Sequence, residues 1–277
     1  MENIDTVNQT LNCTINSQLK IACQTGNIEL VKYLISISNI QYDNKTYLLC
    51  DIHSNNDYMF NIACQEGHID IIKYLISISE KYTGKKIDIH YNKNIVFFMA
   101  CKNKHFIVVK YLIEMAEEYS GQKIDIFCAY HVSTTCIAAS IVAGSVEIIK
   151  YIFMIAKTYY NCPFDIHLQN DIYFSLACYS GHVNVVKYLM EIAESYSGTK
   201  INNIMTGLWY GYKYNHLPIL KYLTKTCVKY SDKMISFVGS NNFDKYINNI
   251  TTFTQCDKYL YSIGIYNKSN HRELIIL

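Results

Sequence analysis

The chain has 277 residues, of which 50% are hydrophobic and 17% charged, a balance that permits a large buried core and argues against an intrinsically disordered chain. Its 25 basic and 23 acidic side chains give a net charge of +2, so no excess of positive charge points to nucleic acid or to anionic lipid. The first residues lack the basic and apolar regions of a signal peptide, and no apolar run approaches the roughly 20 residues that cross a bilayer. We therefore expect a folded, cytoplasmic protein whose 11 cysteines are free thiols.

Residues 1–16 are polar and rich in Asn and Thr, which suits an N-terminal cap or arm, whereas residues 17–230 repeat one pattern. The most regular feature of that pattern is the dipeptide Lys-Tyr after two apolar residues. It begins six times, at intervals of 41, 37, 40, 37 and 34 residues: Lys32, Lys73, Lys110, Lys150, Lys187 and Lys221. A small residue stands ten positions before each lysine: Ala22, Ala63, Ala100, Ser140, Ala177 and Gly211. Such a period predicts about six stacked units, none of which can bury its apolar face alone.

Each unit is predicted to hold two helices. In the second unit, residues 60–67 indicate a short first helix that ends at Gly67, because glycine readily adopts the left-handed conformation just past a helix. Ile71, Leu75 and Ile78 then fall on one face of a second helix, about thirteen residues long. Gly84, eleven residues after the lysine, marks the end of that helix.

These columns resemble the ankyrin repeat. The resemblance lies in Ala63-Cys64-Gln65-Glu66-Gly67-His68 with Ile71-Ile72-Lys73-Tyr74-Leu75, and in residues 177–182 and 185–189 of the fifth unit. It implies an all-α solenoid of stacked helix-turn-helix units with short finger loops, whose fingers and first helices line a concave face that binds partner proteins. The family's Thr-Pro-Leu-His turn is absent, with Tyr58-Met59-Phe60-Asn61 in its place. The Ile-, Asn-, Lys- and Tyr-rich composition also resembles the ankyrin proteins of large DNA viruses of amoebae (mimivirus-like), which implies the cytoplasm of a host cell.

The units differ mainly in the finger between one second helix and the next first helix. From the Asp or Asn that opens the finger to the next small residue, the count is 12, 12, 15, 12 and 9, whereas the count from small residue to lysine is always ten. The first unit also has four extra residues near Thr46–Leu49. Variation confined to the fingers fits a binding role, and neutral drift of exposed loops is the alternative interpretation.

The predicted protein-binding surface combines the most distinctive finger and first-helix residues. Trp and Tyr often dominate interface energetics, the third finger (127–135) is the longest, and the sixth unit contains the single Trp. The surface includes nine residues: Tyr58, Lys93, Tyr130, His131, Tyr173, Tyr179, Trp209, Tyr210 and Tyr212. The alternative for the sixth unit is that its aromatic side chains pack against a C-terminal cap.

Histidine and cysteine follow the repeat. Seven of the nine histidines occupy two columns: His68, His105, His182 and His216 five residues before the lysine, and His53, His90 and His167 two residues after the aspartate. Equivalent positions in stacked units do not gather several ligands around one ion, so we predict structural histidines and no metal site. Four cysteines share the column after the small residue and are predicted to be small core residues: Cys23, Cys64, Cys101 and Cys178. The chain has no phosphate loop, nucleophile elbow or zinc-protease pair, so we predict no catalytic residue, no cofactor and no enzymatic activity.

Residues 231–277 are interpreted as a degenerate repeat followed by a C-terminal cap and tail, with Lys245 in the place of the next repeated lysine. The whole pattern predicts a monomeric, non-enzymatic scaffold for protein-protein interaction that binds neither nucleic acid nor membranes. The alternative hypothesis is a viral substrate adaptor for a host ubiquitin ligase, which would recruit the ligase through the segment after Asp232.

Overall fold

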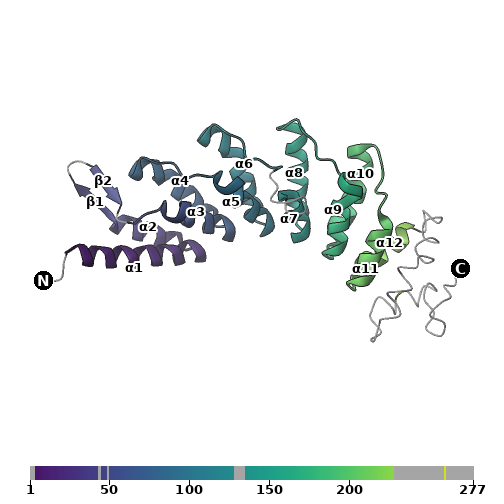
Figure 1. The fold of residues 1–277 in the computed structure, drawn as a ribbon, viewed down its shortest axis with the longest axis horizontal. Coiled ribbons are helices and arrows are strands. Elements are labelled where there is room, and N and C mark those ends of the chain that lie inside the picture. Colours follow the sequence, from purple (N-terminus) through teal and green to yellow (C-terminus); the bar gives the residue numbers. More distant parts are fainter. Residues whose placement is uncertain (1–3, 43–44, 49, 128–134, 228–258, 260–277) are drawn as a thin grey trace. The chain divides into compact units, whose positions relative to one another are not determined.

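The computed structural model describes residues 4–42, 45–48, 50–127, 135–227 and 259. Within these ranges the chain forms six pairs of helices (Figure 1): α1 (Ile4–Thr25) and α2 (Ile28–Ile37), α3 (Ser54–Glu66) and α4 (Ile69–Thr83), α5 (Tyr91–Lys102) and α6 (Phe106–Ser120), α7 (Cys136–Ala143) and α8 (Val146–Thr158), α9 (Leu168–Tyr179) and α10 (Val183–Ser197), α11 (Ile204–Lys213) and α12 (Leu217–Cys227). The strands β1 (Asn39–Tyr42) and β2 (Lys45–Leu48) lie between the first two pairs in the sequence. None of the helices in the described ranges is long and apolar enough to cross a membrane.

The helices stack like on like within two compact parts of the chain, residues 1–143 and 144–277. In the first part α1 packs against α3, α3 against α5 and α5 against α7, while α2 packs against α4. In the second part α9 packs against α11, and both α8 and α12 pack against α10. First helices therefore lie beside first helices and second helices beside second helices, which confirms the predicted all-α solenoid of helix pairs.

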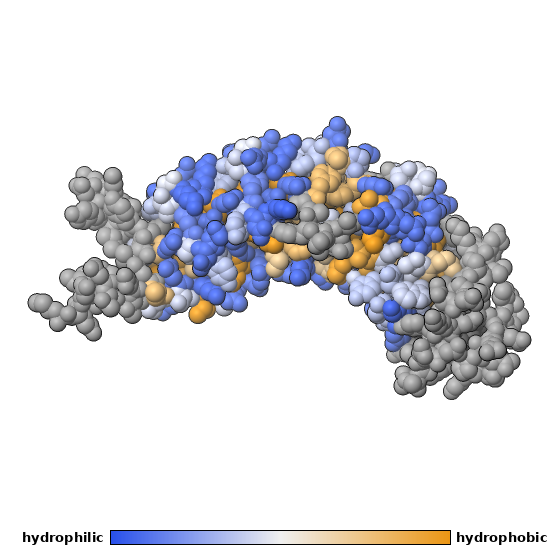
Figure 2. Space-filling view, viewed as in Figure 1, coloured by the Kyte–Doolittle hydropathy of each residue, from blue (hydrophilic) through white to orange (hydrophobic). Residues whose placement is uncertain are grey.

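The column of small residues lets neighbouring first helices approach closely. Ala63 is fully buried, and so is Phe60, one helical turn before it. The same pair recurs as Phe97 with Ala100 and as Phe174 with Ala177. Full burial of a phenylalanine stabilises a fold by about 1.5–3 kcal/mol, so these columns contribute much of the cohesion between repeats. Hydrophilic residues cover most of the described surface in Figure 2, with smaller hydrophobic patches between them.

The ends of the helices are fixed by left-handed residues, as the glycine columns predict. Gly67 after α3 has a φ of 84° and Gly84 after α4 a φ of 70°. Where glycine is missing from the first of these columns, Lys104 and Asn215 adopt the same conformation, with φ of 66° and 57°. The second helices α4, α6 and α10 have 15 residues each, two more than predicted, whereas α8 has 13.

The repeated Lys-Tyr dipeptide links several of the second helices to the next one within each part of the chain. The ammonium of Lys73 lies 5.5 Å from the ring centroid of Tyr111, the tyrosine of the following dipeptide. The same contact recurs in the second part of the chain, from Lys150 to Tyr188 at 5.2 Å and from Lys187 to Tyr222 at 5.5 Å. Each cation-π contact of this kind contributes about 0.5–1 kcal/mol at an exposed site.

The series of contacts continues to Tyr259, beyond the sixth repeat. The ammonium of Lys221 lies 5.4 Å from the ring centroid of Tyr259, and the hydroxyl of Tyr259 lies 2.9 Å from Thr224 Oγ1. Tyr259 belongs to another Lys-Tyr dipeptide, which begins 37 residues after the sixth repeated one. Tyr259 therefore makes the contact expected of the tyrosine of a next unit, and the interpretation of Lys245 stays a prediction. The rest of residues 231–277, including the predicted cap and tail, lies outside the described residues.

The first finger contains a β-hairpin, which the prediction of simple finger loops missed. Strands β1 and β2 pair antiparallel, with Asn39 opposite Leu48 and Tyr42 opposite Lys45. The four extra residues of the first unit fall in and beside β2. They give the chain enough length to double back, so that the backbone groups of the finger bond to each other.

The tips of the first, second and fourth fingers share an unusual backbone. Three consecutive residues at each tip lie in the left-handed region: Asn55, Asn56 and Asp57; Asn92, Lys93 and Asn94; and Gln169, Asn170 and Asp171. This conformation costs roughly 1–2 kcal/mol per residue and is tolerated best by Asn and Asp, which fill most of these positions. The regular part of each first helix begins only after this turn, so another interaction must hold the tip in place.

Candidate functional site: an aromatic surface on α9 and α11

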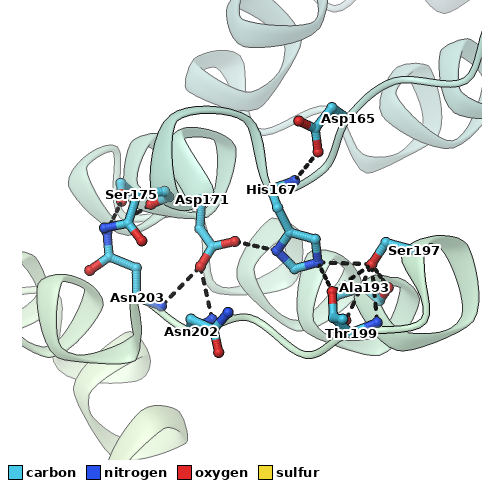
Figure 3. Close-up of polar contacts among 10 residues, drawn as sticks. Asp165, His167, Asp171, Ser175, Ala193, Ser197, Thr199, Asn202 and Asn203 are labelled. Carbon is cyan, nitrogen blue, oxygen red and sulfur yellow. Dashed lines mark hydrogen bonds and ion pairs between the residues drawn. The ribbon is translucent and has the colours of Figure 1, made fainter.

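A histidine and an aspartate hold the fourth fingertip, at the start of α9 (Figure 3). Nδ1 of His167 lies 2.5 Å from Oδ1 of Asp171, whose Oδ2 accepts the backbone N–H groups of Asn202 at 2.8 Å and Asn203 at 2.9 Å. Nε2 of His167 lies 2.8 Å from Oγ of Ser197, at the end of α10. One buried carboxylate therefore joins the fourth fingertip to the fifth finger, and the imidazole joins it to α10, the second helix of the same repeat. We call this arrangement the histidine clamp.

The histidine clamp recurs in the second and third repeats. Nδ1 of His53 lies 2.5 Å from Oδ1 of Asp57, and the other carboxylate oxygen accepts the backbone N–H of Asp88 at 2.8 Å. In the third repeat an asparagine takes the place of the acid, with His90 Nδ1 2.8 Å from Asn94 Oδ1. These contacts replace the Thr-Pro-Leu-His turn that the sequence lacks, because they fix each fingertip against the next finger.

The other histidine column packs on the glycine column of the preceding repeat. Nε2 of His105 donates to the carbonyl of Gln65 at 2.8 Å, and its ring lies so close to Gly67 that an added Cβ there would come within 2.4 Å of Nδ1. His68 and His216 make the same bond to the carbonyls of Gln24 and Tyr179, at 3.1 and 3.0 Å. The predicted structural role of these histidines is confirmed. Among the described residues, no three His, Cys, Asp or Glu side chains lie close enough together to hold one metal ion.

The aromatic residues of the fifth and sixth repeats form one cluster. The ring centroid of Tyr179, at the end of α9, lies 5.7 Å from that of Tyr210 and 4.8 Å from that of Tyr214, both on the α11 side. Trp209 contacts Tyr210 at 4.9 Å, and the ammonium of Lys213 lies 4.3 Å from the centroid of Trp209. We call these five residues the aromatic surface.

The aromatic surface is accessible. Tyr179 exposes 48% of its area and Tyr214 exposes 39%, while Trp209, Tyr210 and Lys213 are half-buried. Clustered Tyr and Trp side chains that remain in contact with water have both an apolar body and a polar tip, which suits them to a partner interface. The alternative, that the aromatic residues of this unit pack against a C-terminal cap, concerns residues outside the described ranges.

The structure brings together three of the predicted site residues, Tyr179, Trp209 and Tyr210. The prediction omitted Tyr214 and Lys213, although the spacing contained the signal. Each follows an aromatic residue of α11 by four positions, which places it on the same face of a helix.

Two other predicted residues are core residues. Tyr173 exposes 2% and Tyr212 exposes 5% of its area, so neither belongs to an accessible surface in this structure. Their columns explain the difference: Tyr173 aligns with the buried Met59 and Val96, and Tyr212 occupies the column of the buried cysteines.

The remaining predicted residues lie apart from the aromatic surface in the sequence. Tyr58 is half-buried on α3, with the ammonium of Lys20 at 5.1 Å from its ring centroid. Lys93 is exposed at the left-handed tip of the second finger. Tyr130 and His131 lie outside the described residues. The binding role of the predicted set stays a prediction.

Comparison with known proteins identifies the repeat. The family model described as "Ankyrin repeats (3 copies)" matches three overlapping stretches of the chain, residues 2–83, 19–128 and 60–162. Together these stretches span residues 2–162, more than half of the 277 residues. No curated protein matches the chain, and the suggested viral origin stays a prediction. The helix pairs after residue 162 continue the same columns of small residue, histidine and lysine. The chain therefore belongs to the ankyrin-repeat family, whose repeats generally mediate protein-protein interaction.

Proposed function

We propose that the protein is a non-enzymatic interaction scaffold and that the aromatic surface is part of the face that binds its protein partner. The observation that carries this proposal is the cluster of rings from two consecutive repeats, with Tyr179 and Tyr214 both exposed. The stacked repeats support it, because each adds an equivalent surface while the histidine clamps hold the fingers in a fixed geometry.

Affinity purification from expressing cells, followed by mass spectrometry, tests the proposal. We expect the wild-type chain to capture a defined partner and the double variant Tyr179→Ala/Tyr214→Ala to lose most of it. Exposed rings contribute little to the folded state, so the melting temperature of the variant should stay close to that of the wild type. Tyr33→Ala is the matched control, because Tyr33 is 59% exposed on α2 and lies outside the aromatic surface.

Two results would count against this function. One is capture of the same partner, in the same amount, by the wild-type chain and the double variant. The other is a large fall in melting temperature for the double variant with partner capture unchanged, which would assign the rings to packing. The ligase-adaptor alternative depends on the segment after Asp232, outside the described residues, and it stays a prediction.

A further inference from the structure

The aromatic surface presents positive charge only. The two helices that carry it contain two charged residues, Asp171 in α9 and Lys213 in α11. Asp171 is 1% exposed, and its carboxylate accepts backbone N–H groups within the histidine clamp. A partner that approaches these two helices therefore meets the ammonium of Lys213 as their accessible charge.

The position of Lys213 among the rings strengthens its effect. Its Nζ lies 4.3 Å from the centroid of Trp209 and 5.2 Å from that of Tyr214, and the side chain is half-buried. Contact with ring faces removes part of the water around an ammonium, and a partly desolvated cation attracts an anion more strongly than a fully hydrated one does. A carboxylate can pair with the ammonium while a neighbouring apolar side chain packs on the rings. A cationic side chain is repelled, because Lys213 already occupies the ring face.

The same charge bias extends to the first helices of the other part of the chain. Among the described side chains of α1, α3, α5 and α7, the exposed charged ones are all basic: Lys20, Lys93 and Lys102. Among the same described side chains the acids are Asp57, buried in a histidine clamp, and Glu66, which is half-buried and accepts a hydrogen bond from Gln65. The second helices differ, since one of them, α6, carries Glu114, Glu117 and Glu118. The exposed charge that the structure describes on these first helices is therefore positive.

We infer that the aromatic surface binds a segment of partner protein in which an acidic side chain stands next to an aromatic or long apolar one. The carboxylate pairs with the ammonium of Lys213, and the apolar neighbour packs on the exposed rings of Tyr179 and Tyr214. This inference rests on the proposed function and adds the chemistry of the partner. Charge-assisted pairing at a half-buried lysine gives the surface its selectivity, and ring packing supplies contact area.

A phage-displayed library of random peptides, selected against the immobilised full-length chain, tests the inference. We expect enriched peptides to carry Asp or Glu beside an aromatic residue or Leu. A synthetic copy of an enriched peptide, labelled for fluorescence anisotropy, should bind Lys213→Glu at least about tenfold more weakly than wild type. Lys213→Met keeps the length of the side chain without its charge and should give a smaller loss. Lys157→Glu reverses an exposed charge on α8 and should leave the Kd within about twofold.

The outcomes separate the two proposals. Two results would overturn the inference and leave the proposed function standing. One is that the peptides whose binding depends on Tyr179 contain no Asp or Glu. The other is that the enriched peptides bind Lys213→Glu as tightly as wild type. If no selected peptide loses affinity in Tyr179→Ala, the aromatic surface is not a binding face and both proposals fail. Melting temperatures of all variants, measured by circular dichroism, distinguish lost contacts from lost folding.

Discussion

The histidine clamp makes Asp171 a sharp test of how the fingers are held. Its carboxylate is buried and has three partners: the imidazole of His167 and the backbone N–H groups of Asn202 and Asn203. Hydrogen bonds to a charged group contribute about 1.5–3 kcal/mol each, but the N–H of the exposed Asn202 can bond to water instead. For Asp171→Ala we therefore expect a loss of about 3–5 kcal/mol in the free energy of unfolding, because two hydrogen bonds to the buried carboxylate are lost.

Urea unfolding at pH 7, followed by far-ultraviolet circular dichroism, measures this loss. Asn170→Ala is the matched control, because Asn170 lies in the same left-handed turn but is exposed, so its change reports only the backbone cost of alanine, about 1 kcal/mol. Asp171→Asn keeps an oxygen that can bond to the imidazole, as that of Asn94 does with His90 in the third repeat, and should cost about 1–2 kcal/mol. Hydrogen exchange should show faster amide exchange at Asn202 and Asn203 in Asp171→Ala. Equal losses for Asp171→Ala and Asn170→Ala would refute the role of the carboxylate.

Three further results are expected. Gly84→Ala should lower the free energy of unfolding by about 1 kcal/mol, because φ is 70° and no atom lies near an added Cβ. Gly67→Ala should lower it by about 2–4 kcal/mol, because the added Cβ would displace the ring of His105. Similar urea midpoints for the two variants would contradict the packing of histidine on glycine. Burial raises the pKa of the Cys23 thiol from 9.0 to about 12 and that of Cys178 still further. A thiol reagent should therefore modify neither cysteine in the native protein at pH 8 until urea unfolds the chain. Rapid modification of either, mapped by mass spectrometry, would show that these cysteines are accessible to solvent. Because these pKa values are raised in the folded state, the unfolded chain binds fewer protons than the folded one above pH 9. The melting temperature should therefore fall as pH rises from 9 to 12. A constant melting temperature over that range would contradict the burial of the thiols.

Most of the helical framework could be predicted because it depends on residues a few positions apart. The eleven residues from Ala63 to Lys73 include one helix end, one left-handed glycine and the start of the next helix, and each leaves a local mark. The fingertips could not be predicted in this way. Asn55, Asn56 and Asp57 contain no pattern that specifies three left-handed residues, since their conformation depends on a backbone N–H of the following finger.

The aromatic surface was predictable only in part, for a similar reason. Residue type identified Tyr179, Trp209 and Tyr210, but type alone also selected Tyr173, which the repeat places in the core. Alignment of each residue with its column separates exposed from buried tyrosines. The contact between Tyr179 and Tyr210 joins two repeats, so it required the stacking of the helices.

The pairing of histidine with glycine restricts which whole units can be deleted or exchanged by recombination. The third unit has Lys104 in place of the glycine, and the fourth unit, which follows it, has Ser145 in place of the histidine that would pack there. Loss of the second unit would bring His105 after Gly26, a compatible join, whereas loss of the fourth would bring His182 after Lys104, where a Cβ and a ring compete for one space. Changes in copy number within this gene are therefore expected to survive at some junctions and to fail at others.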